Sequence, residues 1–275
     1  MSLGEPLFPT LDGIILQIGE AGRRMAEIGA SEGAAGNISV YAGWSLEVQS
    51  VFPLVEEIAL PAAAPALAGG WLLATGSGVR LREIYDHPFE NLGVAQIAPD
   101  GMHARLYTAP SRLFTRLTSE LNSHLAVHND RVAATGANYS ALVHAQPLHL
   151  TYLSHIPRYR DPGELNRRLF RWQPETIMTF PQGIAVLPFI LPGSAELMAA
   201  TTAALHTHRL VVWSKHGVMA HADTSVKHAA DLIEYLETSA RYEVLNLSAG
   251  EPADGLQPDE IRAIARALGI EQTIC

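Results

Sequence analysis

Apolar residues recur at three- and four-residue intervals in parts of the chain, a spacing that places them on one face of an α-helix. This pattern predicts helices at five places: 11–29, 114–125, 194–208, 226–247 and 258–268. Ser194 is a typical N-cap residue and Gly269 a typical helix-ending residue, so both support helix boundaries at those points.

Shorter apolar runs between these helices predict β-strands. They lie at 37–41, 71–75, 93–97, 102–107, 141–145, 175–180, 184–190 and 210–213. The turn signal Pro99-Asp100-Gly101 separates two of them, which predicts a hairpin. Segment 43–70 is rich in Pro and Ala but lacks the charge and Ser/Gly bias of a linker, so we interpret it as an elaborated loop or hairpin.

Length and composition indicate an ordinary folded protein. The chain has 275 residues, of which 48% are hydrophobic and 17% are charged, and this excludes the composition of a disordered chain. Strands and helices alternate without an internal repeat or a break in composition. A single α/β domain over residues 1–275 is therefore the simplest prediction.

The charge balance restricts the expected partners. There are 19 Lys and Arg against 28 Asp and Glu, a formal charge of −9, so we expect neither nucleic acid nor a membrane surface as a partner. Prolines and a Gly-Gly pair interrupt the apolar stretch 59–74, which makes it a poor membrane span. Residues 1–6 lack the basic and apolar regions of a secretory signal, so a soluble, cytoplasmic protein is expected.

Histidines and carboxylates are the candidate metal ligands. The chain has one cysteine, Cys275, which excludes an intramolecular disulfide and a multi-cysteine zinc site. His124 and His128 follow Glu120 at four-residue steps, a spacing able to bind zinc, although we favour a structural role for this common pattern.

Two other histidines lie where side chains leave a sheet. His144 ends a predicted strand directly before a helix that starts at Pro147. His216 follows the strand 210–213 and precedes Gly217, whose missing side chain would let a ligand approach. Each position alone is more typical of a surface or core histidine than of a ligand.

Two glycine-containing segments could present backbone N–H groups to an anion. They are Gly36-Asn37 and Thr75-Gly76-Ser77-Gly78. Each signal is weak alone. The chain has no Rossmann glycine fingerprint and no Walker loop, so the sequence gives no support for nucleotide chemistry.

Taken in order along the chain, the motifs resemble those of the zinc-dependent class II aldolase and adducin family. They are Gly36-Asn37-Ile38-Ser39, Thr75-Gly76-Ser77-Gly78, Thr118-Ser119-Glu120-Leu121, Val143-His144, Glu175 before Phe180-Pro181, and Lys215-His216-Gly217-Val218. The likeness covers nearly the whole chain and is greatest to the L-rhamnulose-1-phosphate aldolases of that family. It implies one three-layer α/β/α domain around a mainly antiparallel sheet, assembled as a homotetramer with active sites at subunit interfaces.

The resemblance also implies the reaction. A metal-dependent aldolase would cleave a ketose 1-phosphate, with L-rhamnulose 1-phosphate expected, to dihydroxyacetone phosphate and L-lactaldehyde through an enediolate. A divalent ion stabilises such an anion as a Lewis acid; zinc is expected, with manganese or magnesium as alternatives. Glu120 matches the family's catalytic base, and Glu175 matches a second glutamate that reaches the neighbouring subunit's site.

Binding residues follow from the same resemblance. The substrate phosphate would rest on five residues: Gly36, Asn37, Ser77, Gly78 and Ser119. His144, Gln146 and His216 would hold the metal, with Gln146 standing where the family has a second histidine of a His-x-His motif. His149 is an alternative ligand that could compensate for that change.

Two other functions remain open from the sequence. One is a phosphopentose 4-epimerase, or an aldolase for another sugar phosphate, since these share the metal-assisted enediolate step. The other is a non-catalytic module like the adducin head domain. The retention of Glu120, Glu175, His144 and His216 argues against the second.

Overall fold

The computed structural model describes residues 8–273. Residues 1–7 and 274–275 lie outside the described part. The predictions made for residues 1–6, on a secretory signal, and for Cys275 therefore fall outside the described residues. The strands are β1 (Asn37–Ala42), β2 (Leu54–Ala59), β3 (Trp71–Thr75), β4 (Leu92–Ile97), β5 (His103–Thr108), β6 (Tyr139–Ala145), β7 (Ala185–Leu187), β8 (Leu210–Trp213) and β9 (Gly217–Ala222). The helices are α1 (Leu11–Glu27), α2 (Pro88–Asn91), α3 (Leu121–Thr135), α4 (Leu148–His155), α5 (Pro162–Phe170), α6 (Pro174–Thr179), α7 (Ala195–Thr207), α8 (Val226–Ser248) and α9 (Pro258–Leu268).

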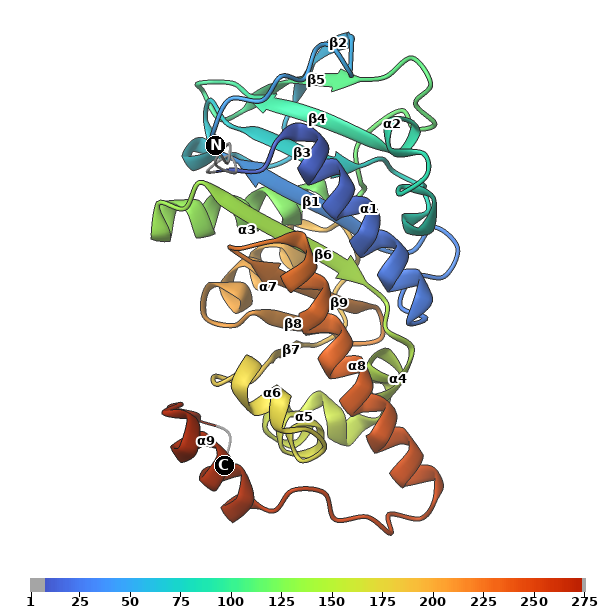
Figure 1. Ribbon diagram of the computed structural model, residues 1–275, viewed down its shortest axis with the longest axis vertical. Helices are drawn as coiled ribbons and strands as arrows, with labels where there is room; N and C mark the ends of the chain where they lie inside the picture. The colour runs from blue at the N-terminus through green and yellow to red at the C-terminus, as the bar shows by residue number, and fades with distance from the viewer. Residues whose placement is uncertain (1–7, 274–275) are drawn as a thin grey trace, which may run out of the picture.

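All nine strands of the described chain form one sheet, in the order β2-β5-β4-β3-β1-β6-β9-β8-β7 (Figure 1). Every neighbouring pair is antiparallel except β7 and β8, which are parallel. The prediction of a mainly antiparallel sheet is confirmed.

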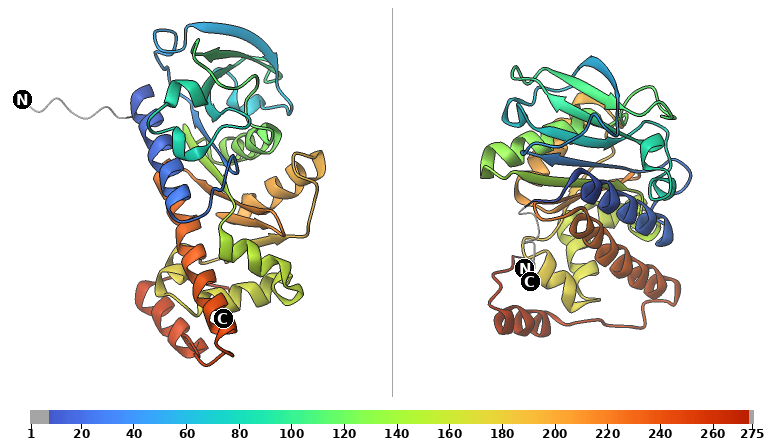
Figure 2. Two further views of the ribbon diagram at one scale, coloured as in Figure 1. Left: turned by 90° about the vertical axis from the view of Figure 1, so that its right-hand side faces the viewer. Right: turned by 45° about the horizontal axis from the view of Figure 1, so that its top comes forward.

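Helices cover both faces of this sheet. In the left view of Figure 2, α1 and α8 lie on one side of it, and α3 and α7 lie on the other. Alternate residues of a strand point to opposite faces, so Val143 of β6 packs in the core under α1 and α8 while Leu142 packs in the core under α7. The three-layer α/β/α architecture predicted from the sequence is confirmed.

The helix predicted from residue 114 begins later, at Leu121. Residues 114–120 instead run beside the end of β3, because Ser77 N–H donates to the Arg116 carbonyl at 2.9 Å and Thr118 N–H to the Thr75 carbonyl at 2.9 Å. These bonds use backbone groups that a helix would have used for itself.

Other predictions need correction. Residues 175–180 form α6 rather than a strand, since Pro174 at its first turn has the φ of a helix and Ile177 packs on α9. Of the strand predicted at 184–190, only β7 pairs with the sheet. Neither β9 nor α5 had been predicted.

The segment 43–70, predicted as an elaborated loop or hairpin, contains β2. This strand pairs with β5 at one edge of the sheet. Its side chains are largely exposed, which explains its weak hydrophobic pattern.

Within residues 8–273, no helix is both long enough and apolar enough to cross a membrane.

Candidate active site

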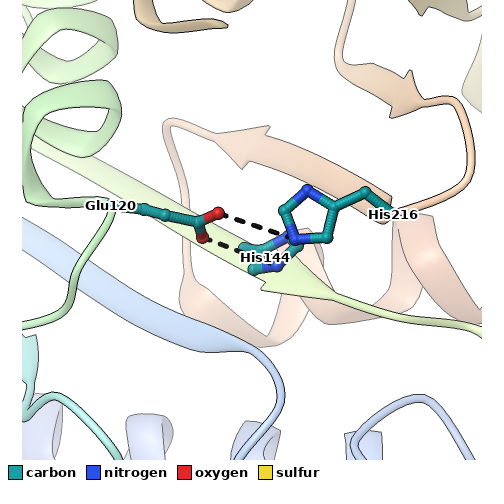
Figure 3. Close-up of side chains that lie close together, drawn as sticks. All are labelled: Glu120, His144 and His216. Atoms are coloured by element: carbon teal, nitrogen blue, oxygen red, sulfur yellow. Dashed lines mark ion pairs between the residues drawn. The ribbon is translucent and has the colours of Figure 1, made fainter. Parts of the chain in front are cut away.

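Three side chains from distant parts of the chain converge at one end of the central strands (Figure 3). Nε2 of His144 lies 3.5 Å from Oε2 of Glu120. Nε2 of His216 lies 3.7 Å from Oε1 of the same carboxylate. Glu120 and His144 are 4% and 2% exposed, so the group is almost closed to solvent from their side.

Strand register brings the parts of this site together. Asn37 at the start of β1 pairs directly with His144 near the end of β6. Ala145 pairs with Val218 of β9, so the turn that carries His216 lies at the same end of the sheet. Glu120 is the N-cap residue of α3, and its N–H donates to Oγ1 of Thr118 at 3.3 Å.

A three-residue turn between β8 and β9 positions His216. Trp213 pairs with Gly217 across this turn, and Lys215 has a φ of 66°, the left-handed conformation that costs a side-chain-bearing residue about 1 kcal/mol. Lys215 N–H donates to Oγ of Ser154 at 2.7 Å, which holds the strained residue from α4.

The orientation of His144 is fixed on two sides. Its Nδ1–H donates to the carbonyl of Val218 at 2.8 Å, which orients the ring so that Nε2 faces Glu120. The buried ring of Trp213 packs against His144 and His216, with centroid separations of 4.7 Å and 5.1 Å. Nδ1 of His216 has no hydrogen-bond partner among the described residues, so ring packing is its main support.

Burial and neighbouring charge set the protonation of the group. Burial acts to raise the pKa of Glu120, but His144, the hydrogen bond from Asn37, and His216 together hold that pKa below its ordinary value. Burial, assisted by His144, lowers the pKa of His216 to about 4. At neutral pH the site therefore presents a carboxylate and an uncharged His216, the forms that bind a metal ion.

The arrangement fits a divalent cation. The candidate ligand atoms of Glu120, His144 and His216 lie within 4.8 Å of one another. Ligands around a tetrahedral ion with bonds of about 2.0–2.1 Å are roughly 3.3 Å apart, close to the 3.5 Å and 3.7 Å separations observed. Two imidazoles and a carboxylate are also side chains of the kind that bind zinc.

The residues predicted to bind phosphate lie around the same end of the sheet. Ser39 of β1 pairs with Ala74 of β3, so the start of β1, with Gly36 and Asn37, lies near the end of β3. Ser77 and Gly78 follow β3, and Gly78 is exposed with a φ of 80°. Ser119 is exposed and lines a cavity of about 550 Å³ between the start of α3, the start of α7 and the β2 edge.

Asn37 already has partners within the protein. Its Nδ2 donates to Oε2 of Glu120 at 2.9 Å, and its Oδ1 contacts Nε2 of His124. Gly36 has a φ of +85°, and a Cβ there would lie 2.8 Å from the His144 carbonyl oxygen, so only glycine fits this approach of the chain to β6.

Three predicted residues lie outside the Glu120, His144 and His216 group. Glu175 is exposed on α6, beyond the β7 edge of the sheet (Figure 1). His149 donates its Nδ1–H to Glu237 of α8 at 2.6 Å, on the other face of the sheet. Gln146 follows β6, and its Cγ lies beside Gly217.

Sequence reasoning missed several residues that shape the site. Trp213 was seen only as a residue of a predicted strand, and Lys215 was named within a motif without a role of its own. Ser39, His124 and His128 form a buried hydrogen-bonded line behind Asn37. Its signals in the sequence were the motif that ends at Ser39 and the four-residue spacing of the two histidines. The structure gives these histidines hydrogen-bonding roles, as we favoured.

Comparison with known proteins agrees with this geometry. Residues 17–244 match the family described as Class II Aldolase and Adducin N-terminal domain. The chain belongs to this family. Its curated relatives include proteins named rhamnulose-1-phosphate aldolase from Bacteroides thetaiotaomicron, 29% identical over 264 residues (95% of this chain, 96% of the relative), and from Yersinia pestis, 30% identical over 214 residues (78% and 77%).

A solved structure shares the fold. It is the crystal structure of a sugar-phosphate aldolase from Thermotoga maritima, whose sequence is 28% identical to this chain. The two structures align with a TM-score of 0.71, over 88% of this chain and 98% of the Thermotoga maritima chain. The resemblance drawn from the ordered motifs, and the fold it implied, are thereby confirmed.

Proposed function

We propose that this protein is a metal-dependent aldolase that cleaves a ketose 1-phosphate, with L-rhamnulose 1-phosphate as the substrate and dihydroxyacetone phosphate and L-lactaldehyde as products. The observation that carries the proposal is the convergence of Glu120, His144 and His216. The aldolase relatives support a lyase activity of the class II aldolase type, as the sequence predicted. Neither the epimerase nor the adducin-like alternative gains support from a feature of the structure.

Glu120 is the proposed acid–base residue. Its carboxylate is ionised and buried, which are the properties required to accept and return a proton at the substrate carbon. A bound divalent ion would supply Lewis-acid stabilisation of the anion left when the carbon–carbon bond breaks.

His144 and His216 are the proposed metal ligands. The Val218 carbonyl orients His144, and the low pKa of His216 keeps it uncharged. Gln146 is the proposed third ligand from the protein, since its side chain lies beside Gly217 next to His216, whereas His149 is bonded to Glu237. Zinc suits two imidazoles, and an amide oxygen in place of a third shifts the preference towards manganese or magnesium.

The substrate phosphate is proposed to bind at Gly36, Asn37, Ser77, Gly78 and Ser119. An amide nitrogen carries two hydrogens, so Asn37 can donate to Glu120 and to a phosphate oxygen together. The turn after β3 and the start of α3 add backbone N–H groups.

The central test is Glu120→Gln, an isosteric change that removes the proton acceptor. With dihydroxyacetone phosphate and L-lactaldehyde as condensation substrates, turnover should fall by roughly 10²- to 10⁴-fold. Metal content, measured by mass spectrometry, should stay near that of the parent, because two histidines and Gln146 remain and the isosteric amide keeps an oxygen in the place of the carboxylate. Retention of more than about a tenth of the rate would remove Glu120 from this role.

The metal shell is tested by a matched pair of variants. Gln146→His should raise zinc affinity because it adds an imidazole to the site, and Gln146→Ala should lower zinc affinity because it removes a proposed ligand. Calorimetry on metal-stripped protein measures both. If His144→Ala and His216→Ala bind metal as tightly as the parent, the proposed site is wrong.

We further propose a homotetramer in which Glu175 completes the neighbouring subunit's site. Its exposed position on α6, outside its own subunit's cluster, supports this role. Glu120→Gln and Glu175→Gln chains are each expected to be inactive, and mixed oligomers of the two should recover part of the activity. Mixed oligomers with no activity would contradict a site shared between subunits.

A further inference from the structure

A line of buried polar side chains leads away from Glu120 between β1, β6 and α3. Its members are each no more than 8% exposed: Asn37, Ser39, His124, His128 and Ser140. Asn37 and Ser39 are alternate residues of β1 and therefore share a face, and His124 and His128 are one helical turn apart on α3. The line occupies space in the core that apolar side chains would ordinarily fill.

The hydrogen bonds at the Glu120 end have one direction. An ionised carboxylate only accepts hydrogen bonds, so Asn37 must present its NH₂ group to Oε2 of Glu120, which lies 2.9 Å away. The carboxamide oxygen then faces His124, whose Nε2 must carry the hydrogen that it accepts. The orientation of Asn37 and the tautomer of His124 thus depend on each other.

The remaining links continue in the same direction. Burial keeps His124 uncharged by lowering its pKa to about 4, so its Nδ1 has no hydrogen and accepts from the Ser39 hydroxyl at 2.6 Å. That hydroxyl has then used its hydrogen and accepts from Nε2–H of His128 at 2.7 Å. Nδ1 of His128 accepts from the Ser140 hydroxyl, also at 2.7 Å. Each group therefore determines the orientation of the next.

We propose that Ser39 and His124 are positioning residues that keep the NH₂ group of Asn37 facing Glu120 and so hold the carboxylate between His144 and His216. Loss of the Ser39 hydroxyl would remove the donor that fixes the ring of His124 and leave space beside it. The ring of His124 would then shift together with the Asn37 side chain to which it donates. The bond from Asn37 to Glu120 would weaken, and the carboxylate would move away from the two imidazoles. The catalytic consequence rests on the proposed function, whereas the position of Glu120 does not.

The test compares two buried serines. Ser39→Ala removes the hydroxyl from the line, and Ser123→Ala is the control, because Ser123 is equally buried, lies beside His124 in the chain, and its Oγ has no partner among the described residues. Ser39→Ala should lower kcat on the order of 10- to 100-fold with little change in KM, as a misplaced catalytic group does. Ser123→Ala should keep kcat within about twofold. Ser39→Thr restores a hydroxyl and should recover much of the rate.

A merely structural role would give a different result. Ser39→Ala would then lower the melting temperature while the folded protein kept its kcat, and this outcome would overturn the proposal. If Ser39→Ala does not fold, Ser39→Cys supplies a group of similar shape and weaker donor strength, for which an intermediate loss of kcat is expected.

Crystal structures of the variants separate this inference from the proposed function. The carboxylate of Glu120 should be displaced from His144 and His216 in Ser39→Ala and unchanged in Ser123→Ala, whether or not the protein cleaves a sugar phosphate. A displaced carboxylate in a protein without aldolase activity would refute the proposed function and retain the positioning role. An undisplaced carboxylate in Ser39→Ala would refute the positioning role.

Discussion

Replacing Gly217 with alanine is expected to damage both the sheet and the site. Gly217 opens β9 directly after His216 and pairs with Trp213. A Cβ at this position would lie 2.4 Å from the carbonyl oxygen of Ala145, 3.1 Å from Cγ of Gln146 and 3.2 Å from Cε1 of His144. The first contact involves backbone, so β6 and β9 must separate to admit the methyl group.

The magnitude follows from the kind of contact. Overpacking of a tight interior costs about 1–3 kcal/mol, and a chain of this size loses roughly 2–4 °C in melting temperature per kcal/mol. We therefore expect Gly217→Ala to melt about 2–12 °C below the parent. Because the new methyl group also presses on His144 and Gln146, zinc affinity should fall by about tenfold or more, which corresponds to about 1.4 kcal/mol.

Differential scanning calorimetry and zinc titration measure the two effects. Gly13→Ala is the matched control, since among the described residues its new Cβ would meet only Thr10 Oγ1 at 3.5 Å and Pro9 Cβ at 3.7 Å. In α1 this control should leave metal affinity unchanged and raise stability by about 0.5–1 kcal/mol. If Gly217→Ala matched the parent in melting temperature and zinc affinity, close packing at the start of β9 would not be the reason for glycine there.

Three further predictions concern supports of the site. Glu237 accepts hydrogen bonds from two backbone N–H groups at the start of α4, at 3.0 and 3.1 Å, so Glu237→Gln should lower the free energy of unfolding in urea by about 2 kcal/mol. The control Glu234→Gln, on the same helix as Glu237, breaks the exposed ion pair with Arg24 and should lower it by under about 1 kcal/mol. Lys215→Gly should be more stable than Lys215→Ala by about 1 kcal/mol, because only glycine relieves the left-handed φ of 66°; equal unfolding midpoints would contradict this. Burial lowers the pKa of His124 to about 4, so below about pH 6.5 the unfolded state binds more protons than the folded state, and the free energy of unfolding should fall by up to roughly 3 kcal/mol as the pH drops to 4. His124→Gln should make the free energy of unfolding, measured over the same pH range, less dependent on pH.

Local signals in the sequence determined most of the elements. Helices marked by a capping residue were predicted where they occur: α7 begins after Ser194, and α9 ends at Gly269 with a φ of 64°. The turn at 99–101 joins β4 and β5 as predicted, because Asp100 accepts the N–H groups of the two residues that follow Gly101. Such features act within a few residues, so the sequence alone can specify them.

Elements without a strong local signal were decided by packing. Residues 175–180 are too short for periodicity to separate a strand from a helix, and contact of Ile177 with α9 accompanies the helical form. β9 escaped prediction because its central position between β6 and β8 buries both faces and removes the alternating pattern. The late start of α3 depends on backbone bonds to the end of β3, more than forty residues earlier in the chain.

The ordered motifs determined which residues are candidates for chemistry, including Glu120, His144 and His216. Only the tertiary structure decided that these three meet, since their convergence depends on the pairing of Asn37 with His144 and of Ala145 with Val218. A shift of one residue in either register would turn the side chains of a strand to the opposite face of the sheet. Sequence therefore specified the chemical groups of the site, and long-range strand pairing determined their distances and protonation.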